Sequence, residues 1–180
     1  MAIMPTTHSV LWLTGPPCSG KTTIAAELHQ YFGKRSSFFD GDTIRNTISK
    51  DLQPGPQDRE KNLNRVLDLI KAKKGISEIV IAAFVSPDVQ LRALTKERLE
   101  SAGFRFILVH VSASPATCME RDVKGLYKKF KDGDTSILLP GFNDRYDIPL
   151  DASVICNTDK EDLQACVKKI IDYVASTSNV

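Results

Sequence analysis

A glycine-rich segment between an apolar run and a helical pattern constrains this chain more than any other feature. The residues from Gly15 to Thr22 read GPPCSGKT and match the pattern G-x-x-x-x-G-K-[ST]. The apolar run VLWLT precedes them, and Ile24, Leu28 and Phe32 follow at helical spacing. Glycines at both ends let the backbone curl, so that successive N–H groups face phosphate oxygens in front of a helix N-terminus. The sequence therefore predicts a phosphate loop that binds a nucleoside triphosphate.

Individual residues of this loop have separate predicted roles. Lys21 reaches the β- and γ-phosphates, the Thr22 hydroxyl ligates Mg²⁺, and Cys18 contributes its backbone N–H. GTPase switches, motor ATPases and small-molecule kinases share such a loop, but this chain has no [NT]-K-x-D guanine signature. We expect ATP and Mg²⁺ as cofactors. The residues predicted to hold the nucleotide here are Gly15, Cys18, Ser19, Gly20, Lys21, Thr22 and Thr23.

Strand-like and helix-like segments alternate along the whole chain. Short apolar runs predict strands at 10–14, 37–39, 79–85, 106–111 and 153–156, and apolar residues at helical spacing predict helices between them. This alternation predicts an α/β fold of the three-layer P-loop NTPase type, with a parallel five-stranded sheet and helices on both faces. The length suits a single domain over residues 1–180. Ligands in such sheets bind at the carboxyl ends of the strands.

Composition excludes several other classes of protein. A net charge of +2 excludes a strongly basic nucleic-acid binder. The longest apolar run, at 79–85, is seven residues and far from the ~20 that cross a bilayer. The first nine residues show no signal-peptide pattern. Four cysteines without CxxC spacing read as reduced cytosolic thiols. We expect a cytoplasmic protein with no membrane or nucleic-acid partner.

Two further segments carry charges suited to a phosphate acceptor. Asp40 and Asp42 follow the second predicted strand, where a carboxylate can orient or deprotonate a hydroxyl or hold Mg²⁺ through water. An acidic turn that only caps a helix is the alternative. Arg59 and Asn62 are three residues apart at a predicted helix start and can hold an anion together, although taken alone they also fit a solvated helix end.

A basic segment late in the chain predicts a mobile lid over residues 121–146. Five positive charges lie within eleven residues, before the flexible run Asp132-Gly133-Asp134. Such a segment can close over a triphosphate and exclude water, and a solvated basic helix face is the alternative. The five charged residues are Arg121, Lys124, Lys128, Lys129 and Lys131.

Several of these segments together resemble one family, the adenylyl-sulfate kinases. The matching pieces are WLTGPPCSGKTT, FFDGDTIR, DREKNLNR, IAAFVSP, ERDVKGLYKKFKDG and, more weakly, GFNDRYDIP. They occur in the family's order and cover most of residues 11–149, and the RDxKGLY run is especially specific. The resemblance implies a kinase that phosphorylates the 3′-hydroxyl of adenosine 5′-phosphosulfate (APS), acting as a homodimer on a small nucleotide substrate.

The resemblance also implies roles for single residues. Asp42 is similar to the family's base or Mg²⁺ partner, with Asp40 beside it, and Lys124 to the lid residue over the substrate phosphates. Arg121 is similar to the lid arginine near the ATP adenine. The implied catalytic residues are therefore Lys21, Asp40, Asp42 and Lys124, and the implied metal ligands are Thr22 and Asp42. The implied acceptor-binding residues are Arg45, Arg59, Asn62, Ser86, Lys124 and Phe142.

Departures from the family pattern fall on the acceptor base. Pro54 and Leu139 stand where the family has two phenylalanines that stack on the adenine of APS. Stacking of this kind is worth about 1–3 kcal/mol per base. Phe142 is the candidate substitute.

Three functions therefore remain open on sequence alone. The first is an APS kinase with a divergent acceptor pocket, and this is the function we predict. The second is a kinase of the same fold for another nucleotide-linked anion, such as cytidine diphosphoramidate in capsule biosynthesis. The third is a non-catalytic nucleotide-binding module. Intact acceptor-side residues such as Arg59 and Asn62 disfavour the third, because a sensor has no need of them.

Overall fold

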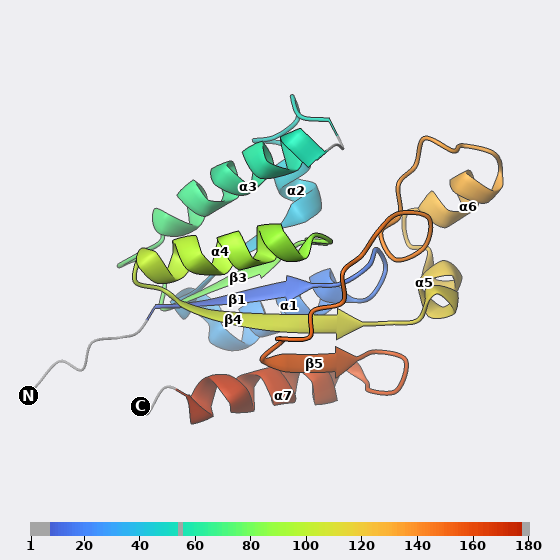
Figure 1. Cartoon of the computed structure of the whole chain (residues 1–180). Coiled ribbons are helices and arrows are strands. Elements are labelled where there is room, and N and C mark those ends of the chain that lie inside the picture. Colours follow the sequence, from blue (N-terminus) through green and yellow to red (C-terminus); the bar gives the residue numbers. More distant parts are fainter. Residues whose placement is uncertain (1–7, 54–55, 178–180) are drawn as a thin grey trace, which may run out of the picture.

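A parallel sheet forms the centre of the molecule (Figure 1). The structure is a computed structural model that describes residues 8–53 and 56–177. Within those residues the strands form one five-stranded sheet in the order β2-β3-β1-β4-β5, and every pairing is parallel. The strands are β1 (Ser9–Thr14), β2 (Ser36–Asp40), β3 (Ile79–Ala83), β4 (Arg105–Ser112) and β5 (Val154–Asn157). The predicted α/β fold with a parallel sheet is confirmed.

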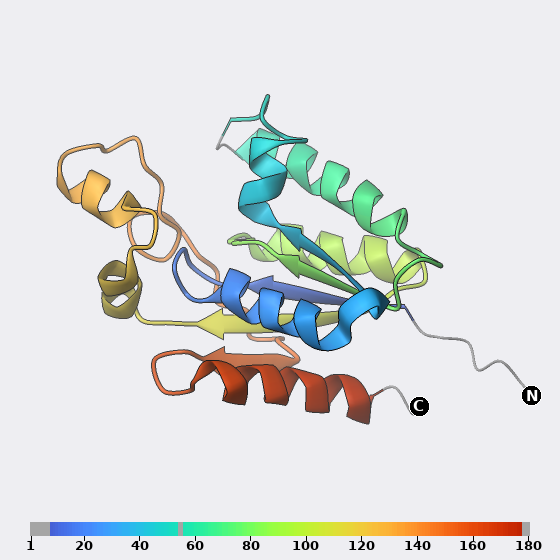
Figure 2. The same ribbon diagram turned by 180° about the vertical axis from the view of Figure 1, so that it is seen from behind.

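Helices cover both faces of this sheet. Helices α3 and α4 lie on one face and α1 and α7 on the other, as the two opposite views show (Figures 1 and 2). Helices α5 and α6 lie beyond the carboxyl end of β4, away from both layers. The helices are α1 (Lys21–Phe32), α2 (Gly41–Asn46), α3 (Pro56–Lys71), α4 (Val89–Ser101), α5 (Pro115–Arg121), α6 (Leu126–Lys131) and α7 (Leu163–Ser176), with a 3₁₀ turn at Gly33–Arg35.

The central strand β1 is buried along its whole length because both of its faces are covered. Successive side chains of a strand point to opposite faces. Leu11 and Leu13 accordingly pack with residues of α1 and α7, whereas Val10 and Trp12 pack with residues of α3 and α4. Two hydrophobic cores result, one on each side of the sheet. This arrangement carries the loop after β1 to the middle of the carboxyl edge.

Differences from the predicted elements are small. Strand β3 ends at Ala83 rather than at residue 85, because the chain turns out of the sheet near Ser86, whose φ is +42°. The last helix begins at Leu163, after the side chain of Asp162, which accepts from the Ala165 N–H at 2.8 Å and caps the helix. Pro54, and residues 1–7 of the N-terminal segment that lacks a signal-peptide pattern, lie outside the described residues.

No helix in the described part of the chain is both long enough and apolar enough to cross a membrane.

Candidate active site

The phosphate loop joins β1 to α1 at the centre of the sheet's carboxyl edge. A side chain at Gly15 would put its Cβ 2.2 Å from the Val111 carbonyl oxygen, so the loop lies directly against β4. Gly20 caps α1 with a φ of +102°, and Cys18 adopts a φ of +64°, which is unusual for a residue with a side chain. This backbone is the curled form that a phosphate loop requires.

Lys21 is held inside this loop. Its ammonium donates to the carbonyl oxygens of Gly15 at 2.9 Å and Pro16 at 2.7 Å. Only 8% of the residue is exposed, and this burial lowers the pKa of Lys21 from its usual 10.5 to about 8. Because the burial penalty falls on the charged form, an incoming triphosphate would stabilise that form. Lys21 therefore lies within the loop, and its contact with phosphate stays a prediction.

Asp40 and Asp42 make different contacts at the end of β2. The Thr22 hydroxyl donates to Asp40 Oδ1 at 2.8 Å, and the N–H groups of Asp42 and Thr43 donate to Asp40 Oδ2. Asp40 thus caps α2, which is the alternative use of the acidic turn, and its role toward Mg²⁺ or a hydroxyl stays a prediction. Asp42 instead forms an ion pair with Lys124 of the lid segment. Of the two carboxylates, Asp40 is the one bonded to the predicted metal ligand Thr22, and the metal role of Asp42 stays a prediction.

The donor set fits Mg²⁺. Residues 8–53 and 56–177 contain no group of three or more His, Cys, Asp or Glu side chains that would hold a metal ion by themselves. This is the usual situation for Mg²⁺, which is bound through one or two protein oxygens, water and substrate phosphates. The Thr22 hydroxyl and the Asp40 carboxylate supply such oxygens beside Lys21.

Acceptor-side residues project from α2, α3 and the loop after β3. Arg59 forms an ion pair with Asp144 at 3.0 Å, and both side chains are mostly buried. Asn62 Oδ1 is buried and has no hydrogen-bond partner among the described residues. Ser86 accepts a hydrogen bond from Trp12 Nε1 at 3.0 Å. Asn62 and Ser86 both line the cavity described below.

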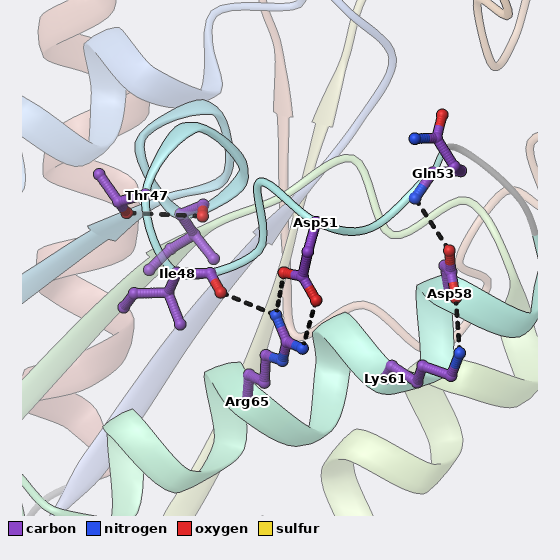
Figure 3. A network of polar contacts seen from close by, with 8 residues as sticks. Thr47, Ile48, Asp51, Gln53, Asp58, Lys61 and Arg65 are labelled. Atoms are coloured by element: carbon purple, nitrogen blue, oxygen red, sulfur yellow. Dashed lines mark hydrogen bonds and ion pairs between the residues drawn. The ribbon is translucent and has the colours of Figure 1, made fainter.

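Residues 48–53, which follow α2, are tied to α3 (Figure 3). Arg65 donates to both carboxylate oxygens of Asp51, at 2.6 and 2.8 Å, and to the Ile48 carbonyl at 2.7 Å. This pairing lowers the pKa of Asp51 to about 2. Asp58 accepts from the Gln53 N–H at 2.8 Å, which lowers the pKa of its carboxyl as well. A wall of the acceptor region is thereby held in place.

Within the predicted lid, residues 121–146, Arg121 contacts the phosphate loop, whereas Phe142 packs against other residues of the same segment. Arg121 donates to the Thr158 hydroxyl at 3.0 Å, to the Thr158 carbonyl at 2.8 Å and to the Cys18 carbonyl at 3.3 Å. Phe142 lies edge-on to Tyr127 and Phe130, with ring centroids 5.5 and 5.7 Å apart. It does not line the central cavity.

One cavity of about 880 Å³ connects these groups. A cavity of this size suits one or two nucleotides. Its lining includes most of the predicted site residues, whereas Gly15, Ser19 and Phe142 are outside it. Sequence reasoning missed Trp12, Phe84 and Thr158 as lining residues, because each sits in an apolar or loop segment with no chemical pattern. The predicted residues that line the cavity are Cys18, Gly20, Lys21, Thr22, Thr23, Asp40, Asp42, Arg45, Arg59, Asn62, Ser86, Arg121 and Lys124.

A phosphate loop beside a two-carboxylate turn and a cation-lined acceptor cavity defines a P-loop phosphotransferase. The family model described as adenylylsulphate kinase matches residues 7–157, and the chain belongs to that family. The adenylyl-sulfate kinase of Shewanella baltica (strain OS155) is 35% identical over 170 residues, which are 93% of this chain and 82% of the relative. That of Staphylococcus carnosus is 36% identical over 168 residues, 92% of this chain and 83% of the relative.

Solved structures agree with this family assignment. The Mycobacterium tuberculosis APS kinase, solved in complex with AMPPNP and APS, is 25% identical with a TM-score of 0.84 and covers 95% of this chain and 99% of its own. A gluconokinase from Sinorhizobium meliloti shares only the fold, at 15% identity, a TM-score of 0.68, and coverage of 96% and 94%. The chain is therefore an adenylyl-sulfate-kinase-like phosphotransferase, and the non-catalytic alternative is set aside.

Proposed function

We propose that this chain, as a single kinase domain over residues 1–180 with a mobile lid, transfers the γ-phosphoryl group of ATP to the 3′-hydroxyl of adenosine 5′-phosphosulfate. One observation carries the proposal: a single cavity is lined both by the triphosphate-binding side chains Lys21 and Thr22 and by the acceptor-side cations Arg45 and Arg59. The family membership and the relatives named adenylyl-sulfate kinase support the same acceptor.

On the donor side, the chain binds and orients the triphosphate. The loop N–H groups and Lys21 hold the β- and γ-phosphates, and Thr22 and Asp40 would hold Mg²⁺. Mg²⁺, when bound, neutralises charge on the phosphate oxygens. Arg121, bonded to Thr158 beside the loop, closes the nucleotide end of the cavity.

On the acceptor side, Asp42 orients the attacking hydroxyl. A bond forms between the acceptor O3′ and the γ-phosphorus, and the bond from that phosphorus to the β–γ bridging oxygen breaks, which leaves ADP. The hydroxyl proton passes to the Asp42 carboxylate. In the structure Lys124 pairs with Asp42. Once the acceptor hydroxyl replaces Lys124 beside Asp42, the lysine is free to bind the phosphates of the substrates. Arg45, Arg59, Asn62 and Ser86 hold the 5′-phosphosulfate nucleotide.

A second acceptor is favoured by one specific observation. Leu139, at the position of a family stacking phenylalanine, is fully buried against Cys118 and Tyr127, and Phe142 lies outside the cavity lining. The described lid residues therefore contribute no aromatic ring to the cavity lining on which an adenine could stack. This favours an acceptor with a different base, such as cytidine diphosphoramidate, bound by the same anion-holding residues.

A coupled ATP-consumption assay separates the two. Mg·ATP is supplied with APS, with cytidine-linked acceptors or with no acceptor, and ADP formation is followed. Turnover that strongly favours APS supports the proposal. Activity only with a cytidine-linked acceptor would refute APS as the substrate and assign the second function. The homodimer implied by the family is tested separately, by light scattering of the purified chain.

A further inference from the structure

A buried arginine behind the acceptor end of the cavity has no role in the reaction described so far. Arg92 of α4 is 3% exposed, and it does not line the cavity of about 880 Å³. Among the described residues its guanidinium forms no direct ion pair, and its Nε is buried without a hydrogen-bond partner. The Asp147 carboxylate, whose pKa is lowered chiefly by Arg145 and more weakly by Arg92, is the nearby negative charge. A buried charge without a direct ion pair is costly. The contacts of its two remaining nitrogens explain why an arginine is buried here better than any gain in the stability of the fold does.

Those nitrogens tie together two segments from different parts of the fold. Nη1 donates to the Ser86 carbonyl at 2.7 Å, and Nη2 donates to the Asp147 carbonyl at 2.6 Å. Ser86 follows β3, and Asp147 follows the predicted lid segment. The guanidinium is planar and its two donors have a fixed separation, so it sets the distance between the two carbonyls.

The first segment needs this support because its backbone is strained. Ser86 has a φ of +42°, which residues with a side chain rarely adopt. Three side chains hold it there: Trp12 donates to its hydroxyl, and Arg92 and Thr14 donate to its carbonyl. Strained residues persist only where their surroundings determine their position in this way. Ser86 itself lines the cavity, so the strain is located at the acceptor wall.

The second segment carries the end of the predicted lid. The Arg92 guanidinium lies over the Tyr146 ring, 5.9 Å from its centroid, and the Tyr146 hydroxyl pairs with Thr14 at 3.1 Å. Two residues earlier, Asp144 forms its ion pair with Arg59. Fixing residues 146 and 147 therefore also fixes where Asp144 meets the acceptor-side arginine.

We propose that Arg92 is a positioning residue for acceptor binding, which acts from outside the cavity by holding the Ser86 and Asp147 carbonyls at a set separation. This rests on the proposed function only in that an acceptor nucleotide binds at this end of the cavity. Small displacements of positioned groups are expensive in such sites. The hydrogen bonds of Arg92 go to Ser86 and Asp147 and not to the phosphate loop. Loss of Arg92 is therefore expected to weaken the binding of the acceptor and not that of ATP.

The test compares the KM values for the two substrates. Arg92→Met is expected to raise the KM for the acceptor at least tenfold and to change the KM for ATP less than twofold. Arg92→Lys keeps the charge but lacks the planar fork, so it is expected to resemble Arg92→Met. Lys96→Met, an exposed residue of the same helix with the same loss of charge, is the matched control and is expected to keep both KM values.

Several outcomes would overturn the inference. Unchanged acceptor KM in Arg92→Met, equal increases for both substrates, or full rescue by Arg92→Lys would each do so. Calorimetric binding of ADP shows whether each variant is folded. If Arg92→Met is not, Tyr146→Leu replaces it, because it removes the ring under the guanidinium and is expected to raise the acceptor KM severalfold. Acceptor binding is also measured directly by calorimetry.

Failure of the proposed function gives a different pattern. If the wild-type chain uses a cytidine-linked acceptor instead of APS, the assigned substrate is wrong, and the Arg92 comparison is made with the acceptor that it does use. A wild-type chain that binds no nucleotide acceptor overturns both proposals.

Discussion

Replacing Lys21 with methionine is expected to abolish phosphoryl transfer and to remove a pH-dependent contribution to the stability of the folded chain. Burial lowers the pKa of Lys21 from 10.5 to about 8. Each pKa unit corresponds to about 1.4 kcal/mol, so the charged ammonium costs the fold on the order of 3 kcal/mol at pH 7. Methionine removes that cost but also loses the hydrogen bonds that the ammonium donates to Gly15 and Pro16, and bonds from a charged donor are worth roughly 1.5–3 kcal/mol each. At pH 7 the loss therefore equals or exceeds the gain, and the pH dependence carries the prediction.

The sign of the pH dependence follows from the lowered pKa. Between pH 8 and 10.5 the unfolded chain keeps the Lys21 proton while the folded chain has released it. The unfolded state then binds more protons, so the wild-type chain gains stability from this group as pH rises through that window. The methionine variant has no such gain. Below pH 8 both wild-type states are protonated, and the difference between the two proteins is constant.

Urea unfolding without nucleotide, at several pH values and one ionic strength, measures this difference. The free energy of unfolding of the variant, less that of the wild type, is expected to fall by up to about 3 kcal/mol between pH 7 and pH 10.5. Subtraction removes the contributions of other titrating groups. Lys34→Met, at an exposed lysine, is the control and is expected to show a flat difference. A difference that is independent of pH, or that rises with pH, would refute the reasoning.

Three further predictions concern single groups. Asp42→Ala is expected to lower kcat far more than it weakens ATP binding, because the proposed mechanism places its carboxylate at the acceptor hydroxyl; near-normal kcat in steady-state assays would remove Asp42 from the mechanism. ATP binding at pH 8.5 is expected to take up protons, because phosphate restores the charged form of Lys21; a calorimetric enthalpy that is the same in buffers of different ionisation enthalpy would contradict this. Asp51→Asn is expected to flatten the acid side of the stability curve between about pH 4 and pH 2, since Arg65 lowers the pKa of Asp51 to about 2 and its contribution is lost as pH falls through that range; an unchanged slope in acid unfolding would show that the pair contributes nothing.

Features set by local sequence were predictable. The phosphate loop is specified by residues within one strand, one turn and one helix start, and its backbone follows from Gly15 and Gly20. The order of strands and helices follows from apolar periodicity in the same way. Helices α2, α5 and α6 were not predicted as separate elements, because six or seven residues are too few to show a helical period.

Contacts between distant segments were not predictable. The sequence places Asp40 and Asp42 at one turn, but only the fold shows that Thr22 bonds the first and Lys124 the second. The two side chains of the Lys124–Asp42 pair are 82 residues apart in the chain. Likewise Phe142 was a candidate for the cavity, yet Tyr127 and Phe130 offer its ring an apolar contact that no local pattern reveals.

The ion pairs of Lys124 with Asp42 and of Arg59 with Asp144 give the chain an internal competitor for its own anion sites. An anion that binds either cation displaces a tethered carboxylate, whose local concentration is high and does not change with dilution. The affinity for an anion is thus a difference between two pairing energies, and a singly charged ion gains little by the exchange. Doubly charged phosphate groups gain more, because the attraction to a cation grows with the charge of the anion. If these cations hold the acceptor as proposed, the paired carboxylates select against chloride, acetate and other small anions at that site.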